Sequence, residues 1–143
     1  MEKVNQSLSL SQLANYTSRQ LNQLFDDGNT VSAELLLSFF PKVLERVDAC
    51  FKHINNKYFF DGERSVFNHL HGDQYSMFLY LASNTAYRSK LDLSIASKLF
   101  LLNKTLHGID AFYEIELPEI FLFVHPLGTV LGRAKYKNYF MVY

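Results

Sequence analysis

The sequence predicts a mainly α-helical protein: a helical domain over residues 1–108, followed by a shorter part, residues 109–143, built from extended segments. Two observations support this division. Before Gly108, apolar residues recur at helical spacing in successive segments. After Gly108, the chain is rich in Phe, Tyr, Val, Ile and Leu, holds two of the three prolines and keeps no 3.6-residue period, which is typical of short strands joined by tight corners.

The first helix is predicted over residues 9–25, where leucines stand at helical spacings between polar residues. Residues 26–29, Asp-Asp-Gly-Asn, have the composition of a turn and should end it. Thr30 is the expected N-cap of a second helix. That helix should bend or break before Pro41, because proline lacks a backbone donor and clashes with the preceding turn.

Three more helices are predicted over residues 42–54, 73–88 and 91–106, each with apolar residues aligned on one side. Residues 55–62 between the first two are expected to form a loop. Gly108 is well placed to end the last helix, because glycine readily adopts the left-handed conformation of a helix C-terminus.

Composition excludes several classes of function. Fourteen basic residues balance fourteen acidic ones, so no net charge draws the chain to nucleic acid or to an anionic membrane. No apolar run approaches the roughly 18 residues of a membrane span, and residues 1–12 lack the features of a signal peptide. Cys50, the only cysteine, is expected to be a small buried hydrophobe. We therefore expect a cytoplasmic protein with no nucleic-acid or membrane partner.

Two motifs resemble one family of enzymes. Residues 125–132, His-Pro-Leu-Gly-Thr-Val-Leu-Gly, resemble the His-x-x-Gly-x-Val-x-Gly segment around the catalytic histidine of serine O-acetyltransferases. Asp110 lies fifteen residues before His125, the offset at which that family carries the partner of its histidine. Residues 73–76, Asp-Gln-Tyr-Ser, resemble the family's Asp-x-Tyr-Ser at the start of a helix, and residues 86–88 resemble a later Ala-Tyr-Arg. The resemblance covers about residues 70–143.

The resemblance implies a fold and an activity. Residues 109–143 would form the first, incomplete coils of a left-handed β-helix built from hexapeptide repeats. The activity would be an acetyl-CoA-dependent O-acetylation of L-serine to O-acetylserine, a step of cysteine biosynthesis. Acetyl-CoA would be a co-substrate, and no tightly bound cofactor or metal is expected.

The same resemblance assigns roles to three residues. His125 would be the base that takes the proton of the acceptor hydroxyl, because an imidazole titrates near working pH. Asp110 would orient that imidazole and stabilise its charged form. We expect the two on adjacent rungs of the coil, so that one turn brings them together. Asp73 would bind the acceptor.

Two departures from the family pattern limit these expectations. Family members that use serine carry an aspartate directly before the catalytic histidine, whereas this chain has Val124. A different hydroxyl acceptor, such as a sugar, therefore stays open. In addition, residues 110–143 supply fewer than two coils, and the family's coenzyme groove lies on later ones. We therefore expect a chain truncated before the CoA site, with little turnover by itself.

Other interpretations of the same residues stay open. His125 could be an ordinary residue at a strand end and Asp110 a turn residue. Asp73 could simply N-cap the helix that follows it. His69, His71 and Asp73 could face one side of a strand as metal ligands, but no full ligand set can be identified.

A second hypothesis is a non-catalytic helical module for oligomerisation. The aromatic segment at residues 136–143 would leave an apolar strand edge, which is prone to association. We therefore expect a homo-oligomer that forms through the helices and this C-terminal strand. His53 and His107 are predicted as helix-end residues, where a cation meets the helix dipole favourably.

Overall fold

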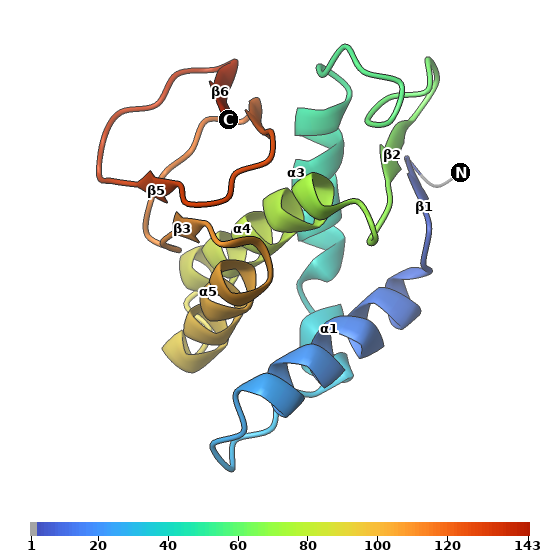
Figure 1. Ribbon diagram of the computed structural model, residues 1–143. Coiled ribbons are helices and arrows are strands. Elements are labelled where there is room, and N and C mark those ends of the chain that lie inside the picture. The colour runs from blue at the N-terminus through green and yellow to red at the C-terminus, as the bar shows by residue number, and fades with distance from the viewer. Residues whose placement is uncertain (1–2) are drawn as a thin grey trace.

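A computed structural model describes residues 3–143 (Figure 1). Within this range the chain is mainly helical, as predicted, with short strands that pair in parallel. The helices are α1 (Leu10–Leu24), α2 (Ala33–Leu37), α3 (Phe40–Phe51), α4 (Gly72–Arg88) and α5 (Leu93–His107). The strands are β1 (Val4–Gln6), β2 (Ser65–Phe67), β3 (Asp110–Ala111), β4 (Phe121–Phe123), β5 (Val130–Leu131) and β6 (Phe140–Val142).

Local side-chain chemistry sets the ends of α1. Ser9 and Gln12 form a capping box, in which each side chain accepts a hydrogen bond from the other residue's backbone N–H, at 3.2 and 2.9 Å. After the helix, the Asp27 carboxylate accepts the N–H of Asn29 at 3.0 Å. The predicted helix and the turn that ends it are both confirmed.

The second helix begins later than predicted. Its N-cap is Ser32, not Thr30: the Ser32 hydroxyl accepts the Leu35 N–H at 3.1 Å. The predicted break near Pro41 is confirmed, because α2 ends at Leu37 and Pro41 lies in the first turn of α3. Proline is tolerated there, since the first N–H groups of a helix have no intrahelical partner.

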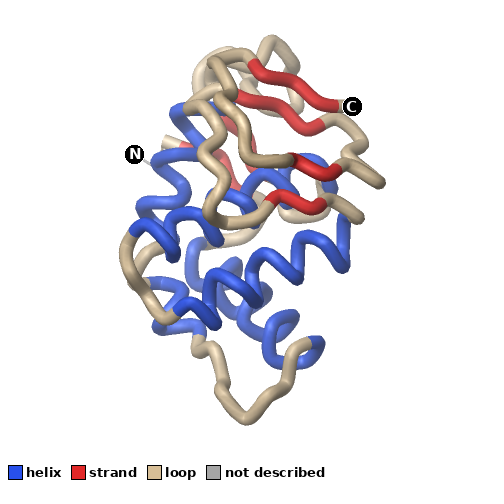
Figure 2. The backbone as a smooth tube through the Cα atoms, turned by 90° about the vertical axis from the view of Figure 1, so that its left-hand side faces the viewer, coloured by secondary structure: helices blue, strands red, loops and turns tan. Residues whose placement is uncertain are grey.

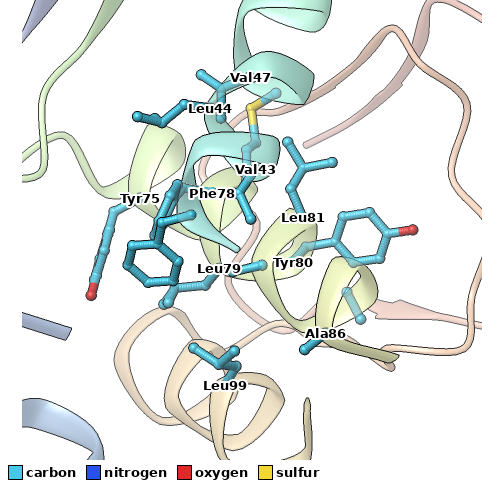
Figure 3. Packing of buried hydrophobic residues seen from close by; sticks show 14 of the residues in the cluster. Val43, Leu44, Val47, Tyr75, Phe78, Leu79, Tyr80, Leu81, Ala86 and Leu99 are labelled. Carbon is cyan, nitrogen blue, oxygen red and sulfur yellow. The ribbon is translucent and has the colours of Figure 1, made fainter. Parts of the chain in front are cut away.

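Helix α4 is the centre of the hydrophobic core. All of its residues from Gln74 to Ala86 are buried. Figure 3 shows side chains of α4 packed against Val43 and Val47 of α3 on one side and Leu99 of α5 on another. This all-round burial explains why the helix carries so little polar surface.

The C-terminal part is a coil of parallel strand pairs. Strand β3 pairs with β5, with Asp110 opposite Val130, and β4 pairs with β6, with Phe121 opposite Phe140. The partners are 20 and 19 residues apart in the chain, so each circuit advances by one strand spacing, about 4.8 Å. Both pairs lie on the same side of the molecule (Figures 1 and 2).

Polar side chains of α4 attach this coil to the helices. The Tyr80 hydroxyl donates to the Ile115 carbonyl and accepts the Leu117 N–H at 3.0 Å. The Asn84 amide donates to the Tyr113 carbonyl at 2.8 Å. One hydrophobic cluster continues from the helices into the coil, and it includes Phe123.

The C-terminal end of α5 also contacts the coil. Gly108 adopts a left-handed conformation (φ 63°) and ends the helix, as predicted. Its carbonyl accepts the Gly128 N–H at 2.9 Å, and a Cβ at this position would lie 3.1 Å from a methyl group of Leu127. A glycine is therefore required here by both conformation and space.

One strand pair was not predicted. Strands β1 and β2 pair in parallel, with Val4 opposite Ser65. Each has only three residues, too few for an alternating pattern to identify a strand in the sequence. In residues 3–143, none of the helices is long and apolar enough to cross a membrane.

Candidate functional site

The structure brings Asp73 and His125 together. The two residues are 52 positions apart, and the backbone N–H of His125 donates a hydrogen bond to the Asp73 carboxylate at 3.1 Å. Asp73 lies in the first turn of α4, where a negative charge is favoured by the helix dipole. His125 lies in the corner of the coil between β4 and β5. The contact therefore joins the two motifs that carry the family resemblance.

Asp73 is not the N-cap of α4, so that alternative is wrong. The cap is His71, whose Nδ1 accepts the Gln74 N–H at 3.4 Å. Histidine has no strong preference for this position, which is why the sequence favoured the aspartate two residues later. The Asp73 carboxylate is consequently available to the coil.

The backbone holds His125 in an uncommon conformation. Its φ of 46° is left-handed, a region that residues other than glycine rarely adopt and that histidine tolerates better than most. The turn that follows is closed by a hydrogen bond from the Thr129 N–H to the Pro126 carbonyl at 3.1 Å. The residue is exposed, and no hydrogen bond from residues 3–143 reaches its imidazole.

Asp110 lies on β3, which pairs with β5, but the residue opposite it is not the expected one. Its strand partner is Val130, and its N–H donates to the Thr129 carbonyl at 2.9 Å. Its carboxylate forms an ion pair with Nζ of Lys104 at 2.9 Å. The circuit of the coil is about five residues longer than the fifteen that separate Asp110 from His125, so His125 falls in the corner before β5 and not opposite Asp110.

A second histidine, His107, lies at the same site. It is the last residue of α5, as predicted, and its Nδ1 lies 2.8 Å from Oδ1 of Asn103. The Asn103 amide group donates to the Ser76 carbonyl at 3.0 Å, and the Ser76 hydroxyl donates to Asn103 Oδ1 at 2.9 Å. Because Oδ1 can only accept, we assign the proton of neutral His107 to Nδ1, which leaves the Nε2 lone pair free.

Burial keeps His107 neutral. It lowers the pKa of His107 below its ordinary value, and the negative charge of Asp73 opposes this more weakly. A Cβ on Gly72 would lie 3.9 Å from the His107 ring, so the imidazole is beside the first turn of α4. His107 can therefore offer a hydrogen-bond acceptor to a ligand held by Asp73.

The sequence contained one signal for this residue. Asn103 and His107 are four apart, so they share one face of a helix. Their link to Ser76, however, depends on how α5 packs against α4, which periodicity does not specify. His107 was therefore predicted only as a helix-end residue.

The three candidate metal ligands do not converge. The His69 ring bonds to the Ser7 hydroxyl at 2.8 Å, His71 caps α4, and Asp73 faces His125. In the part of the chain that the structure describes, no group of three or more His, Cys, Asp or Glu side chains could hold a metal ion.

Cys50 lies apart from this site and is fully buried, as predicted. Its thiol donates to the Phe121 carbonyl at 3.1 Å, which connects α3 to β4. Burial raises the pKa of the Cys50 thiol to about 11, so it stays protonated at neutral pH.

The site thus combines a carboxylate at a helix N-terminus, an exposed imidazole and a partly buried imidazole whose pKa is lowered. The carboxylate can hold an ammonium or hydroxyl group, and either imidazole can accept a proton or a hydrogen bond. No family model, curated protein or solved structure matches this chain. We therefore base the functional proposal on the geometry of the site and on the resemblance of its two motifs.

Proposed function

We propose that this chain carries the acceptor-binding part of an acyl-CoA-dependent O-acyltransferase of the serine acetyltransferase type. The observation that supports it best is the hydrogen bond between the His125 N–H and the Asp73 carboxylate. The resemblance gives these two residues to one active site, although they belong to separate motifs 52 residues apart. The contact is made by the backbone of His125, so it fixes this corner of the coil on α4, and the role of the imidazole is taken from the resemblance.

In this proposal, His125 removes the proton of the acceptor hydroxyl as that oxygen attacks the thioester carbonyl. The thiol of coenzyme A leaves, and the imidazolium returns its proton to the departing sulfur. Asp73 holds the acceptor, and His107 accepts a hydrogen bond from it through Nε2. The exposure of His125 suits this reaction, because the acceptor can approach from solvent.

Asp110 would orient the imidazole after leaving Lys104. The two side chains are 31% and 52% exposed, and an ion pair of this kind contributes only about 0–1 kcal/mol. Breaking the ion pair with Lys104, so that Asp110 can contact His125 instead, therefore costs little free energy. Hydrogen bonds in an unliganded catalytic site are often unformed and tighten when the substrate binds.

The coil is proposed to be the beginning of a left-handed β-helix. Three sides of six residues give about 18 residues per coil, and the parallel partners here are 20 and 19 residues apart. In the resembling family the coenzyme groove belongs to further coils. Acetyl-CoA is accordingly proposed as a co-substrate that residues 109–143 alone would bind only weakly.

The acceptor is either L-serine or another hydroxyl compound, such as a sugar. Val124 occupies the position where serine-specific members carry a second carboxylate, and its N–H is used in the coil, where it donates to the Val142 carbonyl at 2.9 Å. Without that second carboxylate, the site is less suited to an ammonium group than the site of serine-specific members. This favours a neutral polyol over an amino acid.

Saturation-transfer NMR with L-serine and with hexoses tests the proposal. We expect one of these acceptors to bind and Asp73→Asn to lose that binding, because an amide cannot balance the charge or accept as many hydrogen bonds. Asp26→Asn, an exposed carboxylate in the α1–α2 loop, is the matched control and should bind like the wild type. Equal binding by both variants would rule out the acceptor site.

Thiol release from acetyl-CoA tests the chemical step separately. Release near the background of His125→Ala is expected from this chain alone. His53→Ala, which changes another exposed histidine, is the control. Rapid release that depends on His125 would instead mean that residues 1–143 already bind the coenzyme productively.

A second candidate function is self-assembly, favoured by the apolar side chains exposed around β5 and β6. Large apolar side chains are exposed around β5 and β6: Leu127, Val130, Tyr139, Met141 and Tyr143. Such a surface is prone to association when nothing covers it. Sedimentation velocity of Val130→Lys should show a smaller species than the wild type, whereas a wild-type monomer would exclude assembly by this chain.

A further inference from the structure

Arg46 on α3 is a partly buried cation that no carboxylate balances among residues 3–143. Its Nη1 donates to the Thr85 hydroxyl at 2.8 Å and to the Leu81 carbonyl at 3.3 Å. The guanidinium has no other hydrogen bond within that range, and none of its nitrogens is both buried and unpaired. Its Nε and Nη2 groups therefore remain accessible to a ligand.

Arg46 borders a pocket of about 340 Å³ between α3, α4 and residues 117–119. Lys42 and Arg88 also line this pocket, and Glu119 is the one acidic residue that does so. Arg88 is hydrogen bonded to Glu116, which offsets part of its charge. Because water occupies about 30 Å³ per molecule, the pocket has room for a hydrated polyatomic anion.

Two like charges meet at this pocket. Burial, together with the positive charge of Arg88, lowers the pKa of Arg46 to about 10, so Arg46 is still a cation at pH 7. An anion bound between Arg46 and Arg88 would be attracted to both side chains and would offset their mutual repulsion. Guanidinium groups match the oxygens of a phosphoryl group better than an ammonium does, because each presents a planar fork of donors.

We propose that Arg46, Arg88 and Lys42 form a binding site for a phosphate-type oxyanion, either free phosphate or a phosphate monoester. Arg88 is at the opposite end of α4 from Asp73, about 22 Å along the helix. The site is therefore distinct from the acceptor site and does not depend on the proposed function.

Isothermal titration of the full chain with inorganic phosphate and with ribose 5-phosphate tests this site, with chloride added to keep the ionic strength constant. We expect at least one of the two ligands to bind. Comparing them shows whether the pocket binds free phosphate or a phosphate monoester. Arg46→Gln should weaken binding at least tenfold. Arg88→Gln should do the same, and its exposed position guards against loss of the fold.

Two further variants provide controls. Arg133→Gln is the matched control, because Arg133 is also an exposed arginine paired with a glutamate, Glu114, but lies outside the pocket. It should bind phosphate like the wild type. Glu119→Gln removes the one acidic side chain at the pocket and should tighten binding several-fold.

Three results would overturn the proposal: no heat of binding at 10 mM of either ligand, equal weakening by Arg88→Gln and Arg133→Gln, or weaker binding by Glu119→Gln. The last result, with a loss of thermal stability, would mean that Glu119 is itself the partner of these cations. The pocket would then be part of an internal ion network.

Discussion

The helices and the coil achieve order in different ways. Helix α4 is buried from Gln74 to Ala86, so the packing of apolar side chains fixes it on all sides. The strands of the coil have only two or three residues each, and in the outer circuit, which holds β5 and β6, Val130 and Met141 are exposed whereas Leu131 is buried. The first circuit of the coil shares the hydrophobic cluster of the helices, through residues such as Phe123, and polar side chains of α4 and α5 attach it further. The candidate site lies at this junction, where a rigid helix end meets a weakly supported corner.

The largest expected effect comes from the helical core. Phe78 is fully buried and its ring contacts Phe40 of α3 and Phe67 of β2, so Phe78→Ala should lower the free energy of unfolding by about 3–5 kcal/mol, through lost burial and a residual cavity. Met141→Ala on the exposed outer strand should cost less than about 1 kcal/mol. Urea unfolding measures both. Similar losses in the two variants would mean that the coil is as tightly packed as the core.

A smaller effect is expected when a hydrogen bond between α4 and the coil is removed, and it should be confined to the coil. Tyr80→Phe removes the hydroxyl that bonds to both Ile115 and Leu117, which leaves the buried Leu117 N–H unpaired at a cost of about 1–3 kcal/mol. Hydrogen exchange should accelerate in β3–β6 more than in α3. Tyr87→Phe is the control, because no hydrogen bond to the Tyr87 hydroxyl occurs in residues 3–143. Uniform acceleration along the chain would contradict separate attachment.

A third effect depends on pH and concerns the junction. Because burial lowers the pKa of His107 below the ordinary 6.5, the unfolded chain binds a proton more readily than the native one. This contribution to stability is complete above pH 6.5 and is lost as the pH falls through and below that value. His107→Gln should flatten the decline between pH 7 and pH 5 in urea unfolding. An unchanged slope would place His107 in solvent.

The smallest expected effect is a change of reactivity. Because Cys50 is buried and its pKa is raised to about 11, a thiol reagent at pH 8 should label it only when the coil opens from α3. Tyr80→Phe should speed this labelling, and Tyr87→Phe should not. The stability of the fold should also fall above pH 9, where the unfolded thiol ionises first. Immediate labelling of the native protein would contradict the burial.

Much of the helical part could be predicted because its signals are local. The turn at residues 26–29, the proline at position 41 and Gly108 each act within one or two helical turns, and the structure confirms all three. Thr30 and Ser32 are both good caps two residues apart, so propensity alone could not choose between them. Strands β1 and β2 were missed because their pairing depends on tertiary contacts across about sixty residues.

The candidate site could be predicted only in part. The resemblance of two motifs pointed to Asp73 and His125, and the structure places them in contact. Asp110 and His125 were expected to meet on adjacent rungs of the coil, whereas the strand register pairs Asp110 with Val130, because the circuit includes a corner at residues 124–129 that has no helical or alternating pattern. The position of His107 depends on the packing of α5 on α4. The catalytic roles of His125, Asp110 and Asp73 stay predictions.

The acceptor site at the junction is tested most directly by the backbone amide of His125 in a ¹⁵N-labelled chain. During titration with L-serine and with a hexose, we predict that one ligand shifts this amide resonance in a saturable way, because its hydrogen-bond acceptor is the Asp73 carboxylate that would hold the ligand. The same titration of Asp73→Asn should leave the resonance unmoved. A folded wild-type chain whose His125 amide responds to neither ligand would contradict the account.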